Sequence, residues 1–173
     1  EENCFFVMVV AATIDSERLL ENAPGWTMPE RDVIRRAVGS PEVRLFFGEV
    51  AEAASRSDIL MGLGGTANQI CAGLGIPVVS IDEKGKRVQK KLLGDAESLV
   101  PPDPLSLARE TVAILRDPAR REAMANAGRE CMGGSGALES VIEYASVSLG
   151  WRKRHEVYRA FSSFVRSKGE MKE

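Results

Sequence analysis

The sequence predicts an α/β domain in which helices cover a parallel sheet. Short apolar runs alternate along the chain with segments of helical spacing, and this alternation is typical of βαβ units. A glycine-rich stretch at 62–65 separates one apolar run from the helical segment that follows it, which indicates a strand-to-helix turn. With 173 residues and 44% hydrophobic content, the chain can bury one core of ordinary size.

The chain begins with an apolar run, a short helical segment and a loop. We expect residues 4–12 to form a buried parallel strand, because this run is far shorter than the roughly 20 residues that span a bilayer. Residues 16–22 have helical spacing, and either Asp15 or Ser16 would cap that helix. Proline and glycine in the segment 23–29 predict a loop.

The middle of the chain is expected to hold three further strands and two helices. Apolar runs predict the strands and helical spacing predicts the helices. The strands are expected at 43–47, 59–61 and 77–81, and the helices at 49–55 and 66–74. Residues 33–38 fit either a strand or a helical turn, and both interpretations remain open.

The last third is expected to be helical. Asp103 and Pro104 predict the cap and the first position of one helix, and the pair Asp117 and Pro118 repeats this pattern. The glycines at 133–136 predict a break. The apolar positions that we expect to face the core are Leu105, Ala108, Val112 and Leu115 in the first helix and Leu138, Val141, Ile142, Ala145 and Leu149 after the break.

The glycine turn is the strongest chemical signal in the chain. Gly62, Gly64 and Gly65 would let a ligand approach the backbone closely, and Thr66 and Asn68 lie where a helix begins. Free N–H groups at a helix N-terminus favour an anion such as a diphosphate. The spacing matches neither GxxxxGK[ST] nor GxGxxG, which disfavours a P-loop kinase and an NAD dehydrogenase. On spacing alone, a simple strand-to-helix turn explains these glycines equally well.

Longer motifs add a family resemblance. The specific ones are GGTANQ at 64–69 and AGLGIPVV at 72–79, and FFGEVAEA at 46–53 and RECMGGSGA at 129–137 also fit. Together they resemble the donor-sugar-binding half of GT-B glycosyltransferases, most closely the lipid-A-disaccharide synthase-related group. The resemblance spans residues 5–149. It implies a Rossmann-like parallel sheet with helices on both faces over 1–150, one half of a GT-B fold, followed by a helical tail over 151–173.

The resemblance also implies a site for a UDP-sugar, with UDP-N-acetylglucosamine as the expected donor. The residues expected to meet the base are Phe47, Gly48 and Val50. The residues expected to cradle the diphosphate are Gly64, Gly65, Thr66, Ala67, Asn68 and Gln69. The residues expected to reach the sugar or phosphates, from a loop over 82–89, are Lys84, Gly85 and Gln89. No metal ion or other cofactor is expected.

One departure from the family pattern concerns the ribose. Transferases of this fold commonly carry a glutamate about four residues after the Gly-Thr turn, whereas Gln69 and Ile70 stand there in this chain. Gln69 can form hydrogen bonds but has no charge. Donor binding would therefore be weakened, lost, or dependent on another carboxylate such as Glu49 or Glu83.

The resemblance implies that this chain is half of a glycosyltransferase that acts in glycolipid or cell-envelope glycan synthesis. The chain opens with Glu1 rather than Met, and we expect it to be inactive without its N-terminal acceptor domain. We nominate no catalytic residue, because His155 is more simply a surface or interface residue. One alternative is an enzyme resembling UDP-N-acetylglucosamine 2-epimerase, against which the single histidine counts. Another is a non-catalytic relative that serves as a binding or assembly module.

Composition limits which partners and which cellular compartment we expect for this chain. A net charge of −2 argues against nucleic acid as a partner. Three widely spaced cysteines in apolar contexts predict buried thiols in a reducing compartment, and we expect a cytoplasmic protein. Residues 151–168 form a basic amphipathic pattern, which would brace the other domain or lie on an anionic membrane surface at the inner membrane face.

Overall fold

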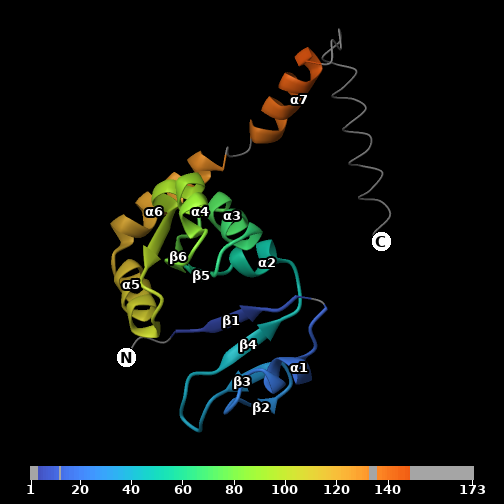
Figure 1. Ribbon diagram of the computed structural model, residues 1–173, viewed down its shortest axis with the longest axis vertical. Helices are drawn as coiled ribbons and strands as arrows, with labels where there is room; N and C mark the ends of the chain where they lie inside the picture. The colour runs from blue at the N-terminus through green and yellow to red at the C-terminus, as the bar shows by residue number, and fades with distance from the viewer. Residues whose placement is uncertain (1–3, 12, 133–135, 149–173) are drawn as a thin grey trace. The chain divides into compact units, whose positions relative to one another are not determined.

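The computed structural model describes residues 4–11, 13–132 and 136–148 (Figure 1). The chain divides into two compact units, Glu1–Cys131 and Met132–Glu173. The first unit contains two β-sheets with helices between their strands, so the predicted α/β class is confirmed. The domain boundary expected after residue 150 lies outside the described residues.

The first sheet has four strands, of which only two are parallel. Its order is β1-β4-β3-β2. β1 (Phe6–Val9) pairs parallel with β4 (Val43–Phe46). β3 (Val33–Arg35) runs antiparallel to β4, and β2 (Thr27–Glu30) runs antiparallel to β3. The expectation of a wholly parallel sheet is therefore corrected for this part of the chain.

A tight hairpin turn accounts for the two antiparallel strands. β2 ends at Glu30 and β3 begins at Val33, so Arg31 and Asp32 alone form the turn. Asp32 has a φ of +59°, a conformation that aspartate tolerates because its short polar side chain bonds locally. The segment 23–29, predicted as a loop, therefore ends within β2. The segment 33–38, predicted as either a strand or a helical turn, begins with β3.

A small apolar core anchors the first sheet. Val10, Ile34 and Leu45 are buried, and Leu19 and Leu20 of α1 (Ser16–Glu21) pack against them. The cap of α1 is Asp15, whose side chain accepts from the Arg18 N–H at 2.7 Å, so one of the two predicted caps is confirmed.

β1 is more exposed than the sequence predicts. The exposed fractions of Val7, Met8 and Val9 are 49%, 40% and 37%. β1 is the outermost strand of its sheet and has a single neighbouring strand, so its apolar side chains are only partly covered. The buried strand expected at 4–12 is therefore a shorter edge strand, Phe6–Val9, whose side chains are partly exposed, and Val10 directly after it is buried.

The second sheet is the expected parallel one. β5 (Leu60–Met61), β6 (Val78–Ile81) and β7 (Glu97–Val100) lie in that order and are all parallel. α2 (Val50–Ala54) leads from β4 into β5, and α3 (Thr66–Gly73) leads from β5 into β6. The sequence did not predict β7, because Glu97 and Ser98 interrupt its apolar pattern.

α4 (Lys86–Leu93) and a short 3-10 turn (Gly94–Ala96) connect β6 to β7. The core beside this sheet contains Val79, Val100, Ile114 and Met124. α5 (Pro104–Arg116) and α6 (Pro118–Cys131) supply the last two of these residues (Figure 1).

The start of α5 is as predicted, but its buried face is not. The Asp103 side chain accepts from the Ser106 N–H at 2.8 Å, and Pro104 opens the helix. Asp117 likewise accepts from the Arg120 N–H at 3.0 Å. The buried positions are Thr111 and Ile114, with Leu107 packed beside them. Among the positions predicted to face the core, Leu105 and Ala108 are exposed and Val112 and Leu115 are half-buried.

The second unit contains α7 (Ala137–Ser148). α6 ends at Cys131, so the break predicted by the glycines at 133–136 is confirmed. Leu138, Val141, Tyr144 and Val147 of α7 are all at least half exposed. The predicted Leu149 and the basic segment 151–168 lie outside the described residues. No helix among the described residues is long and apolar enough to cross a membrane.

The cysteines differ from one another in burial. Cys71 is buried, and burial raises the pKa of its thiol. Cys4 and Cys131 are exposed, so the expectation of three buried thiols is wrong for these two. The Cys131 thiol still bonds the Gly128 carbonyl at 3.4 Å, and desolvation raises its pKa.

Two prominent interactions hold α6 in place. A Cβ atom on Gly128 would collide with the backbone oxygen of Ala72, so α6 and α3 approach closely where this glycine lies. Glu110 of α5 accepts from Ser98 of β7 at 2.5 Å and pairs with Arg120 of α6. The hydrogen bond from Ser98, followed by that from Arg120, holds the pKa of the Glu110 carboxyl below its usual range.

We expect Gly128→Ala to lower the free energy of unfolding by about 2 kcal/mol, because the added methyl group must push two helix backbones apart. Denaturant unfolding measures the change. Gly136→Ala is the control, since a Cβ there meets no atom within 4 Å. Equal stability of the two variants would contradict the close packing of α6 on α3.

We expect Glu110→Gln to cost about 1 kcal/mol of stability at pH 7 and less at pH 3. A carboxyl with a lowered pKa in the folded state stabilises the fold above its unfolded pKa, and this contribution is lost as pH falls through the folded pKa. Urea unfolding at both pH values tests this, with exposed Glu52→Gln as the control. A cost that stays constant with pH would contradict the assignment.

Candidate functional site

The glycine turn joins β5 to α3 at the carboxyl end of a parallel strand. Gly64 has a φ of +116° and Gly65, the residue that caps α3, has a φ of +83°. Other residues rarely adopt these conformations, so the turn requires glycine at both positions. Gly65 supplies no capping side chain, and Gly65 and Thr66 are exposed. The N-terminus of α3 is therefore accessible, where the sequence analysis placed the phosphate site.

Side chains from α4 lie over this turn. Gln89 Oε1 accepts from the Gly65 N–H at 2.8 Å. A Cβ atom on Gly64 would collide with Lys86 Nζ and would lie 2.9 Å from Gln89 Oε1. The segment expected as a loop over 82–89 thus becomes helix from Lys86, and this helix brings an ammonium group to the turn. Gln89 was predicted as a site residue, whereas Lys86 was not.

A buried polar network lies behind the turn. Glu97 of β7 is 1% exposed, and its Oε1 accepts from Ser80 Oγ at 2.8 Å, from Asn68 Nδ2 at 3.1 Å and from Gln89 Nε2 at 3.2 Å. Asn68 Nδ2 also lies 2.9 Å from Ser80 Oγ. Two oxygen atoms in this network, Asn68 Oδ1 and Glu97 Oε2, have no hydrogen-bond partner among the described residues.

Asn68 connects the network to the turn. A Cβ atom on Gly62 would collide with Asn68 Oδ1, so this buried oxygen points at the backbone of the turn. Asn68 was predicted to face the diphosphate, but its side chain is fully buried. Its part in the site is therefore to support the turn from within.

The remaining predicted residues are more scattered. Ala67 and Gln69 are half-buried on α3, while Lys84 and Gly85 are exposed just before α4. Phe47 is 43% exposed, and a Cβ on Gly48 would lie 2.5 Å from the ring of Phe46. Val50 begins α2, which packs against α3. No described hydrogen bond joins Phe47, Gly48 or Val50 to the glycine turn.

The charge at this site suits an anion. The N-terminus of α3 and the Lys86 ammonium both favour negative charge. Lys90 of the same helix is engaged elsewhere, because its ammonium donates to the carbonyl oxygens of Gly94, at 2.6 Å, and Glu97. Within the described ranges, His, Cys, Asp and Glu side chains form no group of three that could hold a metal ion.

Sequence reasoning missed two members of the site, Glu97 and Lys86. Glu97 is a lone charge in the segment AESLV, and such a charge beside apolar residues was the available signal. Lys86 belongs to a run of basic residues that resembles an ordinary solvated helix face. The carboxylates suggested as substitutes for the family glutamate, Glu49 and Glu83, are both exposed.

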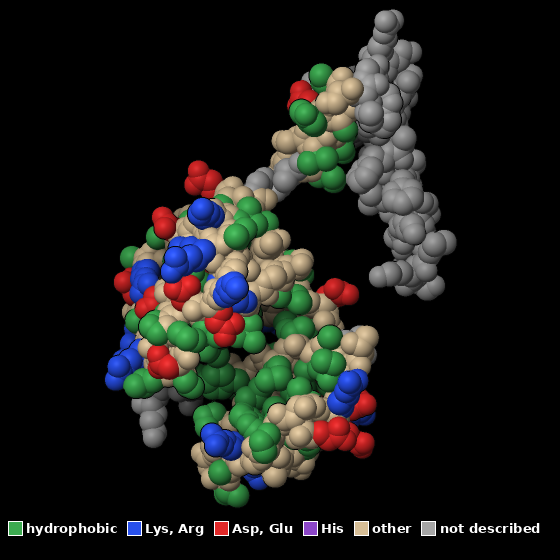
Figure 2. All heavy atoms as spheres, viewed as in Figure 1, with side chains coloured by type: hydrophobic (Ala, Val, Ile, Leu, Met, Phe, Trp, Pro, Cys, Tyr) green, Lys and Arg blue, Asp and Glu red, His purple; other side chains and the backbone are tan. Residues whose placement is uncertain are grey.

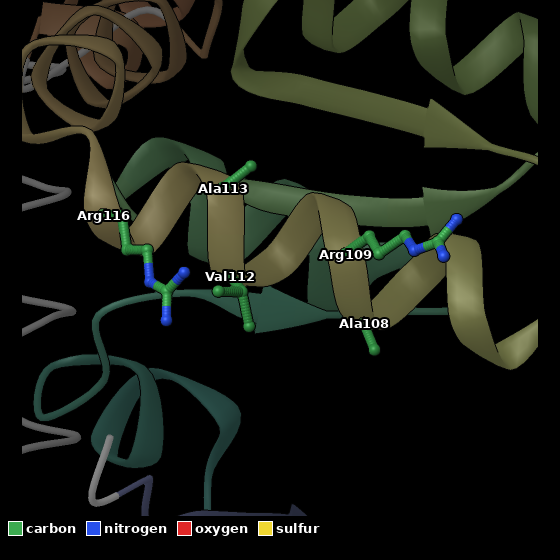
Figure 3. A pocket seen from close by; sticks show the side chains of 5 residues that line it. All are labelled: Ala108, Arg109, Val112, Ala113 and Arg116. Atoms are coloured by element: carbon green, nitrogen blue, oxygen red, sulfur yellow. The ribbon is translucent and has the colours of Figure 1, made fainter. Parts of the chain in front are cut away.

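The structure also has a hollow away from the glycine turn. A hollow on α5 is lined by residues of this helix alone, namely Ala108, Arg109, Val112, Ala113 and Arg116 (Figure 3). On the face seen in Figure 2, lysine and arginine side chains are intermixed with acidic ones and form no single basic patch.

Comparisons with protein-family models, with curated proteins and with solved structures found no match to this chain.

We expect Asn68→Ala to lower the free energy of unfolding by about 2 kcal/mol, because it removes a donor from the buried Glu97 carboxylate. Thermal or denaturant unfolding measures the loss. Asn126→Ala on α6 is the matched control, since Asn126 is exposed. If the two substitutions have equal effects, the network does not support the turn.

Proposed function

We propose that this chain is the donor-binding half of a GT-B glycosyltransferase and that it binds a nucleotide sugar such as UDP-N-acetylglucosamine. The observation that carries the proposal is the start of α3, where a glycine turn and the Lys86 ammonium meet at the carboxyl end of a parallel strand. Ligands of open parallel sheets bind beyond the carboxyl ends of the strands. The motifs GGTANQ and AGLGIPVV support the class of ligand.

In this proposal the diphosphate lies at the N-terminus of α3. The N–H groups of Thr66 and Ala67 and the Thr66 hydroxyl donate to phosphate oxygens, since the first N–H groups of a helix lack partners within the helix. Lys86 supplies the opposing charge. The sugar lies toward Lys84 and Gly85, and the base toward Phe47 and Gly48 and the start of α2 at Val50.

We propose further that the chain binds the donor without transferring the sugar. A transferase needs a base to deprotonate the acceptor, and the described residues offer no histidine at the turn. The base and the acceptor site would belong to the N-terminal domain that the family resemblance implies. Release of UDP from the donor by this chain alone would contradict this part of the proposal.

A non-catalytic relative is the second candidate. Gln69 and Ile70 occupy the positions where the resemblance implies a glutamate for the ribose hydroxyls, and Ile70 is 36% exposed. A chain that has lost this carboxylate can retain the fold as a binding or assembly module. Measurement of nucleotide binding separates the two candidates.

Calorimetric titration of the full chain with UDP, UDP-N-acetylglucosamine and ADP tests the proposal. We expect saturable binding of the two uridine ligands, weaker binding of ADP, and about tenfold weaker binding by Lys86→Gln, because a charge-assisted hydrogen bond to phosphate is lost. Thr66→Val, which removes only the hydroxyl, should also weaken binding.

Lys91→Gln is the matched control, because Lys91 is an exposed lysine on the same helix. It should bind the uridine ligands as the unmodified chain does. Absence of binding by all three nucleotides would favour the non-catalytic candidate. Equal losses in Lys86→Gln and Lys91→Gln would show that binding depends on net charge rather than on the turn.

A further inference from the structure

The side chain of Gln89 accepts a hydrogen bond from the Gly65 N–H, the first backbone donor of the proposed phosphate site. Its Oε1 accepts from the Gly65 N–H at 2.8 Å, and its Nε2 donates to Glu97 Oε1 at 3.2 Å. The amide group is thus held at both ends, between the exposed turn and the buried network.

Glu97 determines which way this amide points. Glu97 Oε1 is an acceptor and the Gly65 N–H is a donor, so the nitrogen of Gln89 faces Glu97 and its oxygen faces Gly65. The reverse orientation would place the oxygen against a carboxylate and the nitrogen against the Gly65 N–H. Asn68 and Ser80 hold the same carboxylate oxygen from the other side.

The buried groups are also incompletely satisfied. Asn68 and Glu97 are 0% and 1% exposed, yet Asn68 Oδ1 and Glu97 Oε2 have no partner among the described residues, and Asn68 Oδ1 points at Gly62 of the turn. Unsatisfied buried oxygens are costly in a purely structural network. The network behind the turn therefore has unused acceptor capacity beside Gly62.

We propose that Gln89 is a displaceable cap on the site, whose amide oxygen a phosphate oxygen of the ligand replaces at the Gly65 N–H. The inference rests on the proposed function in one respect, that a phosphate group reaches the start of α3. An anionic oxygen is the stronger acceptor, and the nearby Lys86 ammonium interacts more strongly with an anion than with a neutral amide. Gln89 is only half-buried, so its side chain can turn away at the cost of its hydrogen bond to Glu97 Oε1, which Asn68 and Ser80 continue to hold.

A displaceable cap and a direct ligand predict opposite effects of the same substitution. Removal of a competing cap leaves the Gly65 N–H free, so Gln89→Ala should bind phosphate about fivefold more tightly, the effect of one neutral hydrogen bond. Removal of a direct ligand would weaken binding instead. Gln89→Met, which keeps the length of the side chain but accepts no comparable hydrogen bond, should act as Gln89→Ala does.

The probe is inorganic pyrophosphate, titrated into the full chain and followed by calorimetry and by NMR of the Gly65 amide and the Gln89 side-chain NH2 signals. We expect both signals to shift on titration of the unmodified chain. Val88→Ala, an exposed position on α4, is the control and should leave the affinity unchanged. Thermal unfolding of each variant confirms that it is folded.

Each outcome decides the inference. Tighter binding by Gln89→Ala and Gln89→Met supports the cap, whereas weaker or unchanged binding overturns it, as does failure of pyrophosphate to bind to any form of the chain. The nucleotide proposal fails separately, if pyrophosphate binds but UDP and UDP-N-acetylglucosamine bind no more tightly than pyrophosphate.

Discussion

The arrangement of the second sheet and of the site beside it depends on the buried carboxyl group of Glu97. A polar group taken out of water is costly unless hydrogen bonds satisfy it. Glu97 draws its donors from α3, β6 and α4, which are the elements that surround the site. The position of β7 therefore fixes side chains on three separate segments, and through Gln89 it reaches the backbone of the exposed turn.

The glycines of the turn allow these side chains to lie close to its backbone. Gly62 leaves room for the Asn68 side chain, and Gly64 leaves room for Lys86 and Gln89, so the network and α4 can both approach the backbone. Positive φ values at Gly64 and Gly65 then direct the chain into α3. Side chains therefore meet the start of α3 both from the buried network and from α4.

Local signals in the sequence predicted local structure well. Asp15, Asp103 and the glycines at 64–65 were placed correctly, because a cap or a turn depends on a few adjacent residues. The face of α5 was wrong, since Leu105 and Leu107 are both apolar and only the position of the second sheet decides which is buried. β7 and the role of Glu97 were missed for the same reason, as their partners lie 8 to 29 positions away in the chain.

The exposed β1 strand has a practical consequence for handling the protein. Residues 5–10, FFVMVV, include no charged residue and no proline, and β1 lies at the edge of its sheet. Natural edge strands usually carry such residues, which block pairing with strands of other molecules. Concentrated solutions of this chain therefore favour intermolecular strand pairing and aggregation. Solubility, rather than unfolding of the core, would then set the upper limit on the concentration at which the protein can be kept.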